Sequence, residues 1–176
     1  MELIEIVDEN GNFTGEILDK EIAHDRNLLH NEIAVFIIND NNQVLLQKRS
    51  ANKRFNPNKW ALCAGHVDAH ESLEDAAIRE TKEEIGLDIT KEDLHDYADR
   101  EFTIQETNSH ITYFYYAKTN KKEEEFTVQV EELSEVKWFD IDKVIEMINN
   151  NDESIVFTKD RLDLFEGLKG IGQIKR

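Results

Sequence analysis

The sequence predicts an α/β protein in which a mixed β-sheet lies between helical layers. Three observations lead to this fold class: short runs of branched and aromatic residues alternate with polar turn clusters, helical periodicity occurs in three places, and several connections are short enough for hairpins. The 176 residues correspond to one domain by length. Within a single domain over 1–176 we expect an N-terminal hairpin extension at 1–30, a core at 31–150 and a C-terminal helical segment at 151–176.

Strands are expected where branched and aromatic residues gather. Residues 2–19, with the turn cluster DENGN in their middle, predict a hairpin laid against the body of the protein. Further strands are predicted at 33–38, 44–47, 102–105, 111–117 and 136–139.

Helical periodicity is longest over residues 72–85, where Ser72 is a favourable N-cap and Gly86 is a stop signal. A second helix is predicted over 141–148, after the capping residue Asp140. A third is predicted over 159–168 near the end of the chain.

The composition limits the classes of partner. With 38 acidic and 21 basic residues the formal net charge is −17, which argues against binding nucleic acid polymers or anionic membranes, because both need a basic surface. No apolar run approaches the roughly 20 residues that span a bilayer. The single Cys63 excludes an intrachain disulfide. We therefore expect a cytoplasmic protein that acts on a small molecule, and a homodimer remains open.

The predicted helix over 72–85 carries carboxylates on one side of its last turns. Glu80 and Glu84 are four residues apart and Glu80 and Glu83 are three apart, so their side chains converge. Carboxylates near a helix C-terminus oppose the helix dipole by roughly 0.3–1 kcal/mol each. A bound hard cation would offset this cost, Mg²⁺ first and Mn²⁺ or Ca²⁺ next. The alternative is a solvated acidic face. Arg79 can pair with Glu83 or reach back to Glu71.

A second charge pattern lies directly before this helix. The segment QKRSANKRFNPNKW, residues 47–60, holds five cations and no acid, although the chain as a whole is acidic. A cationic rim beside a metal site would suit a diphosphate, and a solubilising loop is the alternative. The residues proposed to bind substrate are Lys48, Arg49, Lys59 and His66, the last of which could instead cap a turn.

The stretch from Gly65 to Leu87 resembles the Nudix box, G-x5-E-x7-R-E-U-x-E-E-x-G-U, in which U is a bulky apolar residue. The only departure is Thr81 at the first U position. The positions that match are Gly65, Glu71, Arg79, Glu80, Glu83, Glu84, Gly86 and Leu87.

This resemblance implies a Nudix-type α/β/α sandwich and hydrolysis of a diphosphate linked to another moiety. It implies metal ligands at Glu80, Glu83 and Glu84, with the Gly65 carbonyl as a further ligand. Glu83, Glu80 and Arg79 form the implied catalytic group, and Glu71 and Gly86 the structural brace. The general base is open: Glu83 is the first choice and Glu124, Glu131 and Glu132 are alternatives.

Segments outside the box, among them LLHNEIAVFIIN and W-x4-GH, resemble the Nudix subgroup close to isopentenyl-diphosphate isomerase. Those isomerases use a histidine-rich metal site, and His24, His30 and His66 lie at roughly the corresponding positions. Their cysteine immediately precedes the GH pair, where this chain has Ala64. Cys63 is one residue earlier, which in a strand turns the side chain to the opposite face.

The isomerases also have a downstream E-x-E pair, which corresponds here to Asn108–Ser109–His110 and lacks both acids. We therefore expect a Mg²⁺-dependent Nudix pyrophosphohydrolase, with Mn²⁺ as the other metal, acting on a small nucleoside-diphosphate-type substrate. An isomerase-like enzyme and a non-catalytic nucleotide-binding regulatory module are the alternatives.

Overall fold

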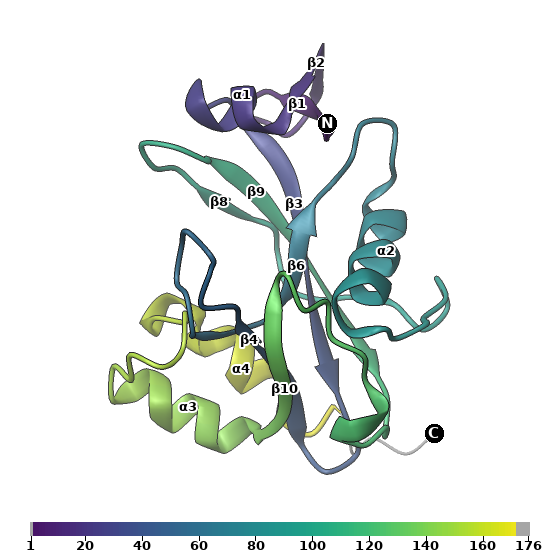
Figure 1. Cartoon of the computed structure of the whole chain (residues 1–176), viewed down its shortest axis with the longest axis vertical. Coiled ribbons are helices and arrows are strands. Elements are labelled where there is room, and N and C mark those ends of the chain that lie inside the picture. The colour runs from purple at the N-terminus through teal and green to yellow at the C-terminus, as the bar shows by residue number, and fades with distance from the viewer. Residues whose placement is uncertain (1, 172–176) are drawn as a thin grey trace.

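The computed structural model describes residues 2–171, and its centre is a mixed sheet arranged around strand β3 (His30–Ile38) (Figure 1). Strand β3 pairs antiparallel with β6 (Cys63–His66) and parallel with β9 (His110–Lys118). Strand β4 (Gln43–Arg49) follows β3 through a tight turn and pairs along its other edge with β10 (Leu133–Asp140). The predicted mixed sheet is therefore confirmed.

The two faces of the sheet bury two separate hydrophobic clusters, because side chains alternate along a strand. On β3, Ile33, Val35 and Ile37 belong to a cluster that includes residues of helix α2 (Leu73–Ile85). Ala34, Phe36 and Ile38 belong to the other cluster, which includes residues of α3 (Ile141–Asn149) and α4 (Leu162–Leu168). Figure 1 shows α2 on one side of the sheet and α3 and α4 on the other, so the predicted helical layers are confirmed.

The N-terminal residues form the predicted hairpin, which lies at one end of the sheet (Figure 1). Strand β1 (Leu3–Val7) pairs antiparallel with β2 (Phe13–Asp19), and β1 joins the central sheet at one position, where Ile6 faces His30. Ile4 and Ile6 are buried with Ala23 of the short helix α1 (Lys20–Asp25).

The remaining elements are short. They are β5 (Trp60–Ala61), β7 (His95–Asp96), β8 (Glu101–Thr103), and the 3-10 turns η1 (Glu123–Glu125) and η2 (Lys159–Arg161).

Most predicted elements are present, with differences that have local causes. The sequence did not predict α1, because six residues are too few to show helical periodicity. The segment predicted as one helix over 159–168 begins with the 3-10 turn η2 and becomes α-helical from Leu162. Asp140 precedes α3 as predicted but makes no side-chain cap; its carboxylate accepts a hydrogen bond from Gln43 Nε2 at 3.2 Å instead.

The division of the chain at residues 30 and 150 stays a prediction. Within residues 2–171 the structure contains no helix with the length and apolar character needed to cross a membrane.

Gly86 gives the fold a testable position. Its φ is +70°, and a Cβ at this position would lie 3.1 Å from Thr127 Cβ. Replacing Gly86 with alanine adds backbone strain and crowding, so we expect the free energy of unfolding, measured by urea denaturation, to fall by more than about 1 kcal/mol.

The matched control is Gly15→Ala, since Gly15 has φ +93° with nothing within 4 Å and therefore reports backbone strain alone. Equal losses of stability in the two variants would show that the contact with Thr127 contributes nothing.

Candidate functional site

Helix α2 begins and ends at the predicted residues. The Ser72 hydroxyl accepts a hydrogen bond from the backbone N–H of Asp75 at 3.1 Å, and Gly86 ends the helix in the left-handed conformation. Thr81, the one departure from the Nudix pattern, is fully buried. Its hydroxyl donates to the Ala77 carbonyl at 2.7 Å, so the extra polar atom is satisfied within the helix.

The carboxylate of Glu84 lies between α2 and the sheet. The thiol of Cys63 donates to Glu84 Oε2 at 2.9 Å, and the Gln47 side chain and the Ala64 backbone N–H also hydrogen-bond to this carboxylate. Burial nevertheless raises the pKa of Glu84 to about 8. The ionised form of Glu84 is disfavoured at this position, and a cation bound beside the carboxylate would stabilise that form.

Glu80 lies one helical turn earlier and contacts strand β6. Its carboxylate packs directly against Gly65, and any side chain at that position would collide with it. Burial raises the pKa of Glu80 to about 7, although Arg79 acts in the opposite direction. Gly65 therefore lets the backbone next to its carbonyl approach a carboxylate closely.

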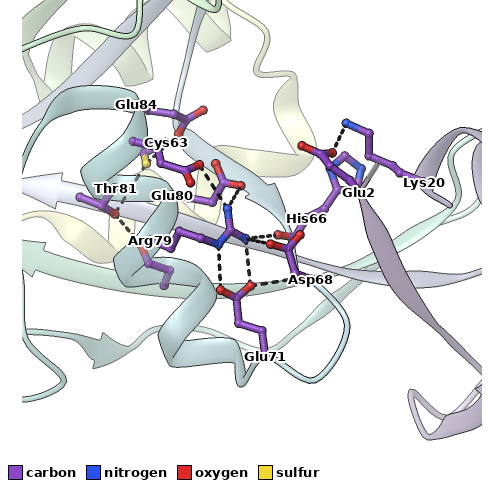
Figure 2. A network of polar contacts seen from close by, with 12 residues as sticks. Glu2, Lys20, Cys63, His66, Asp68, Glu71, Arg79, Glu80, Thr81 and Glu84 are labelled. Carbon is purple, nitrogen blue, oxygen red and sulfur yellow. Dashed lines mark hydrogen bonds and ion pairs between the residues drawn. The ribbon is translucent and has the colours of Figure 1, made fainter. Parts of the chain in front are cut away.

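The guanidinium of Arg79 lies at the centre of the network in Figure 2. It donates from Nε and Nη2 to the two carboxylate oxygens of Glu71, at 2.8 and 2.9 Å, and from Nη2 to the carbonyl of His66 at 3.0 Å. Its Nη1 donates to Glu80 at 2.9 Å and to Glu83 at 3.2 Å. Both pairings that the sequence left open for Arg79 are therefore made at once.

Glu83 differs from its neighbours because its side chain is 49% exposed, against 16% for Glu80. Among the described residues, Glu80, Glu83 and Glu84 do not form a set whose ligand atoms all lie within 4.8 Å of one another. The donor chemistry nevertheless fits a hard divalent cation, because two of the three carboxylates are partly buried with raised pKa values and the third faces solvent.

The basic segment forms the end of β4 and the loop that leads to β5. Arg49 donates from Nε to the carbonyl of Phe55 at 3.0 Å, and its backbone N–H donates to the carbonyl of Lys59 at 2.9 Å. Lys53 forms an ion pair with Glu132. Gln47 hydrogen-bonds to Glu84, so it points to the α2 face of the sheet, and Arg49, two residues later in β4, points the same way. Lys48 lies between them and points to the opposite face, where its ammonium is 6.0 Å from the Trp60 ring.

A second group of ionisable side chains gathers near the N-terminal hairpin. We define it as the histidine cluster, and its members are His24, His30, His66, His110 and Glu32. The ring nitrogens of His24 and His66 are 3.0 Å apart. Glu32 Oε2 lies 3.2 Å from His110 Nδ1, 3.5 Å from His30 Nε2 and 3.6 Å from His66 Nε2.

The histidine cluster has the chemistry of a transition-metal site. The triad His24, His30 and His66 and the triad His30, Glu32 and His110 each place three ligand atoms within 4.8 Å of one another. Burial lowers the pKa of His66 to about 4, so its imidazole is neutral at pH 7 and can act as a ligand. Buried His30 Nε2 has no hydrogen-bond partner within residues 2–171.

Glu32 is the member of this cluster that the sequence interpretation missed. Burial opposes its charge, yet contacts with His30, His66 and His110 outweigh burial and lower the pKa of Glu32 to about 2. The period-2 spacing of His30 and Glu32, directly before the strand predicted at 33–38, was an available signal. The contact with His110 was not, since it depends on the parallel pairing of β3 with β9.

Strand β6 separates the two groups of side chains. Cys63 belongs to the cluster on the α2 face and contacts Glu84, whereas Ala64 packs with the cluster on the opposite face. His66 and Ala64 share that opposite face, because they are two residues apart in one strand. The carboxylates of α2 and the histidine cluster therefore lie on opposite faces of the sheet.

The fold and this site define a Nudix protein: the family model described as the NUDIX domain matches residues 28–159, and the chain belongs to that family.

The chain is similar to a protein named as an isomerase and to several solved structures. Isopentenyl-diphosphate Delta-isomerase 2 of Photorhabdus laumondii is 29% identical over 151 residues, which cover 85% of this chain and 83% of that protein. DR0079 of Deinococcus radiodurans superposes with a TM-score of 0.72 at 20% identity, covering 95% of this chain and 99% of that one.

The NUDIX domain of Shewanella oneidensis NrtR, solved with ADP ribose, has a TM-score of 0.56 at 21% identity, over 78% of this chain and 83% of that one. The two structural similarities establish the fold alone. The predicted α/β/α sandwich of Nudix type is confirmed.

The raised pKa values of Glu80 and Glu84 predict the pH dependence of stability without divalent metal. Both groups titrate near 4.5 when unperturbed, but near 7 and 8 in the native state. Between the unfolded and the native pKa values, the native state binds more protons than the unfolded state. The free energy of unfolding therefore falls as pH rises from about 4.5 to about 8. In EDTA, we expect Glu84→Gln to be more stable than wild type at pH 8, by about 1 kcal/mol or more.

Urea denaturation of both proteins at pH 6 and pH 8 measures this difference. Glu83→Gln is the matched control, because Glu83 is exposed. A Glu84→Gln variant with the same pH slope as wild type would contradict the raised pKa of Glu84.

Proposed function

We propose that this chain is a Mg²⁺-dependent Nudix pyrophosphohydrolase that cleaves a diphosphate bond in a small nucleoside-diphosphate-type substrate. The observation that carries the proposal is the pair of partly buried carboxylates, Glu80 and Glu84, whose pKa values are raised on one helix that also presents Glu83 to solvent. Belonging to the Nudix family supports this activity class. We also propose a cytoplasmic location.

The metal site is proposed at Glu80, Glu83, Glu84 and the Gly65 carbonyl. A bound Mg²⁺ would neutralise diphosphate charge and lower the pKa of a coordinated water. Arg79 and Glu71 form a bidentate ion pair that fixes the loop before α2 relative to the helix. Mn²⁺ is the alternative metal, because it also prefers oxygen ligands.

Glu83 is our first choice for the group that accepts a proton from the attacking water. Its carboxylate is half exposed and pairs with Arg79 on one side only, so it can face a substrate. Glu131 and Glu132 remain alternatives, because their segment lies beside the end of α2, where the Gln129 backbone N–H donates to the Glu84 carbonyl at 3.0 Å. Glu124 is the remaining alternative.

The diphosphate would contact the basic segment. Arg49 is on the α2 side of β4, and we propose Arg49 and Lys59 as phosphate contacts. Lys48 and His66, which the sequence also suggested, point to the sheet face opposite Glu84. The related NrtR domain was solved with ADP ribose, a compound that contains a diphosphate, which supports this substrate class.

The hydrolase proposal makes a direct prediction. We expect Mg²⁺-dependent release of phosphate or nucleotide from a panel of nucleoside diphosphate derivatives, and EDTA should abolish it. Glu83→Gln should lower kcat by at least about a hundredfold, because it removes a proton acceptor.

Glu135→Gln, at an exposed position of β10, is the control that should retain activity. Turnover that persists in EDTA, or a Glu83→Gln variant as active as wild type, would overturn the assignment.

An isomerase acting on isopentenyl diphosphate is the second candidate. The observations that favour it are the histidine cluster and the name of the Photorhabdus relative. Against it stands position 64, which is on the same sheet face as the histidine cluster and carries an alanine that cannot transfer a proton. The only cysteine points to Glu84 on the other face.

Product analysis separates the candidates. With isopentenyl diphosphate and Mg²⁺ or Mn²⁺, we expect no allylic diphosphate by NMR, and His30→Ala should leave nucleotide hydrolysis within about threefold of wild type. Formation of an allylic product that depends on His30 would favour the isomerase. Nucleotide binding without any turnover would favour a regulatory module.

A further inference from the structure

The N-terminal hairpin contacts the loop that carries the brace of the candidate metal site. This loop, residues 67–71, connects β6 to α2 and ends at Glu71. The carbonyl of Leu3 accepts a hydrogen bond from the Ala69 backbone N–H at 2.8 Å, and Ile4 forms an antiparallel bridge with Asp68. Strand β1 therefore acts as an extra strand along the 67–71 loop, outside the matched Nudix segment 28–159.

The 67–71 loop contains a strained turn. The Glu71 backbone N–H donates to the Asp68 carbonyl at 3.1 Å, and His70, the third residue of the turn, has φ +68°. That conformation suits glycine and costs other residues roughly 1–2 kcal/mol. Such strain persists only where surrounding contacts hold the residue in place.

Glu5 of β1 supplies the contact that holds this turn. Its Oε2 accepts a hydrogen bond from the His70 backbone N–H at 2.6 Å. The imidazole of His70 is 79% exposed and lies 4.0 Å from the same oxygen, so the backbone contact is the closer one. A hydrogen bond to a carboxylate is stronger than one between neutral groups, so it can offset the turn's backbone cost.

The His70 turn also holds the residues that contact Arg79. Glu71 Oε1 accepts a hydrogen bond from the Asp68 backbone N–H at 3.0 Å, while both Glu71 oxygens accept from Arg79. Asp68 Oδ2 lies 3.5 Å from Arg79 Nη2. Figure 2 shows Glu71 and Asp68 on neighbouring sides of the guanidinium, with Glu2 and Lys20 of the N-terminal region beyond them.

We propose that Glu5 is a positioning residue for the candidate metal site, acting through the His70 turn on Glu71 and Arg79. The inference rests on the proposed function for its consequence, since Arg79 in turn orients Glu80 and Glu83. Loss of the Glu5 carboxylate frees the turn, weakens the hold on Glu71 and lets the carboxylates of α2 spread. The result is weaker divalent-metal binding.

Two measurements test this proposal on the full chain. Hydrogen exchange reports protection of the His70 amide, and calorimetry with Mn²⁺ reports metal affinity. For Glu5→Ala we expect faster exchange at His70 and Mn²⁺ affinity lowered by about tenfold, as for other residues that orient metal ligands. Glu5→Gln should lie between wild type and Glu5→Ala, because its amide oxygen can still accept from the His70 N–H but carries no charge.

The control is Glu16→Ala, because Glu16 is an exposed residue of β2 in the same hairpin, whereas β1 is the strand that contacts the 67–71 loop. A second variant tests the strain itself: adding His70→Gly to Glu5→Ala should restore Mn²⁺ affinity, since glycine adopts positive φ without penalty.

Faster exchange at His70 with unchanged Mn²⁺ affinity would overturn the positioning role and leave the proposed function standing. Unchanged exchange would overturn the inference directly. Wild-type protein that binds no Mn²⁺ would instead count against the proposed function. An affinity loss of equal size in Glu16→Ala would show that any change in the hairpin suffices, which also overturns the role of Glu5.

Discussion

The ion-pair network of Arg79 is the interaction on which the candidate site depends. One guanidinium joins the loop before α2, through Glu71 and Asp68, to the helix itself, through Glu80 and Glu83, and to β6, through the His66 carbonyl. It balances acids that would otherwise repel one another at the end of a helix whose dipole already opposes them. Removing it would leave partly buried carboxylates without a partner, which is far costlier than losing a surface ion pair.

The alternation of side chains along β6 divides the chemistry of the molecule. Within four residues the strand sends Cys63 toward Glu84 and His66 toward Glu32. The carboxylates of α2 and the histidine cluster are thereby separated by the thickness of one sheet. A shift of one residue in this strand would exchange the two environments, which is why the place of a single cysteine matters for the choice between hydrolase and isomerase chemistry.

Local signals predicted the parts of the site that are local in sequence. The helix over 72–85 could be predicted because it is long, periodic and capped at both ends by Ser72 and Gly86. The sequence offered Glu71 and Glu83 as possible partners of Arg79, and the structure has both contacts. The contact between Glu32 and His110 could not be predicted, because no local pattern specifies the parallel pairing of β3 with β9. The contact of Glu5 with His70 is equally remote, since it depends on how the hairpin docks.

The parallel pairing of β3 with β9 also has a consequence for how the chain reaches its native state. The register places His30 beside His110, so the central strand completes its hydrogen bonds only after 80 further residues have been synthesised. Closing so long a loop is entropically expensive, and proteins dominated by such distant pairings fold slowly. Until then, the apolar run of β3 is open to the pairing of strands between molecules. The acidic composition of the chain, which keeps its copies apart, is a protection during that interval.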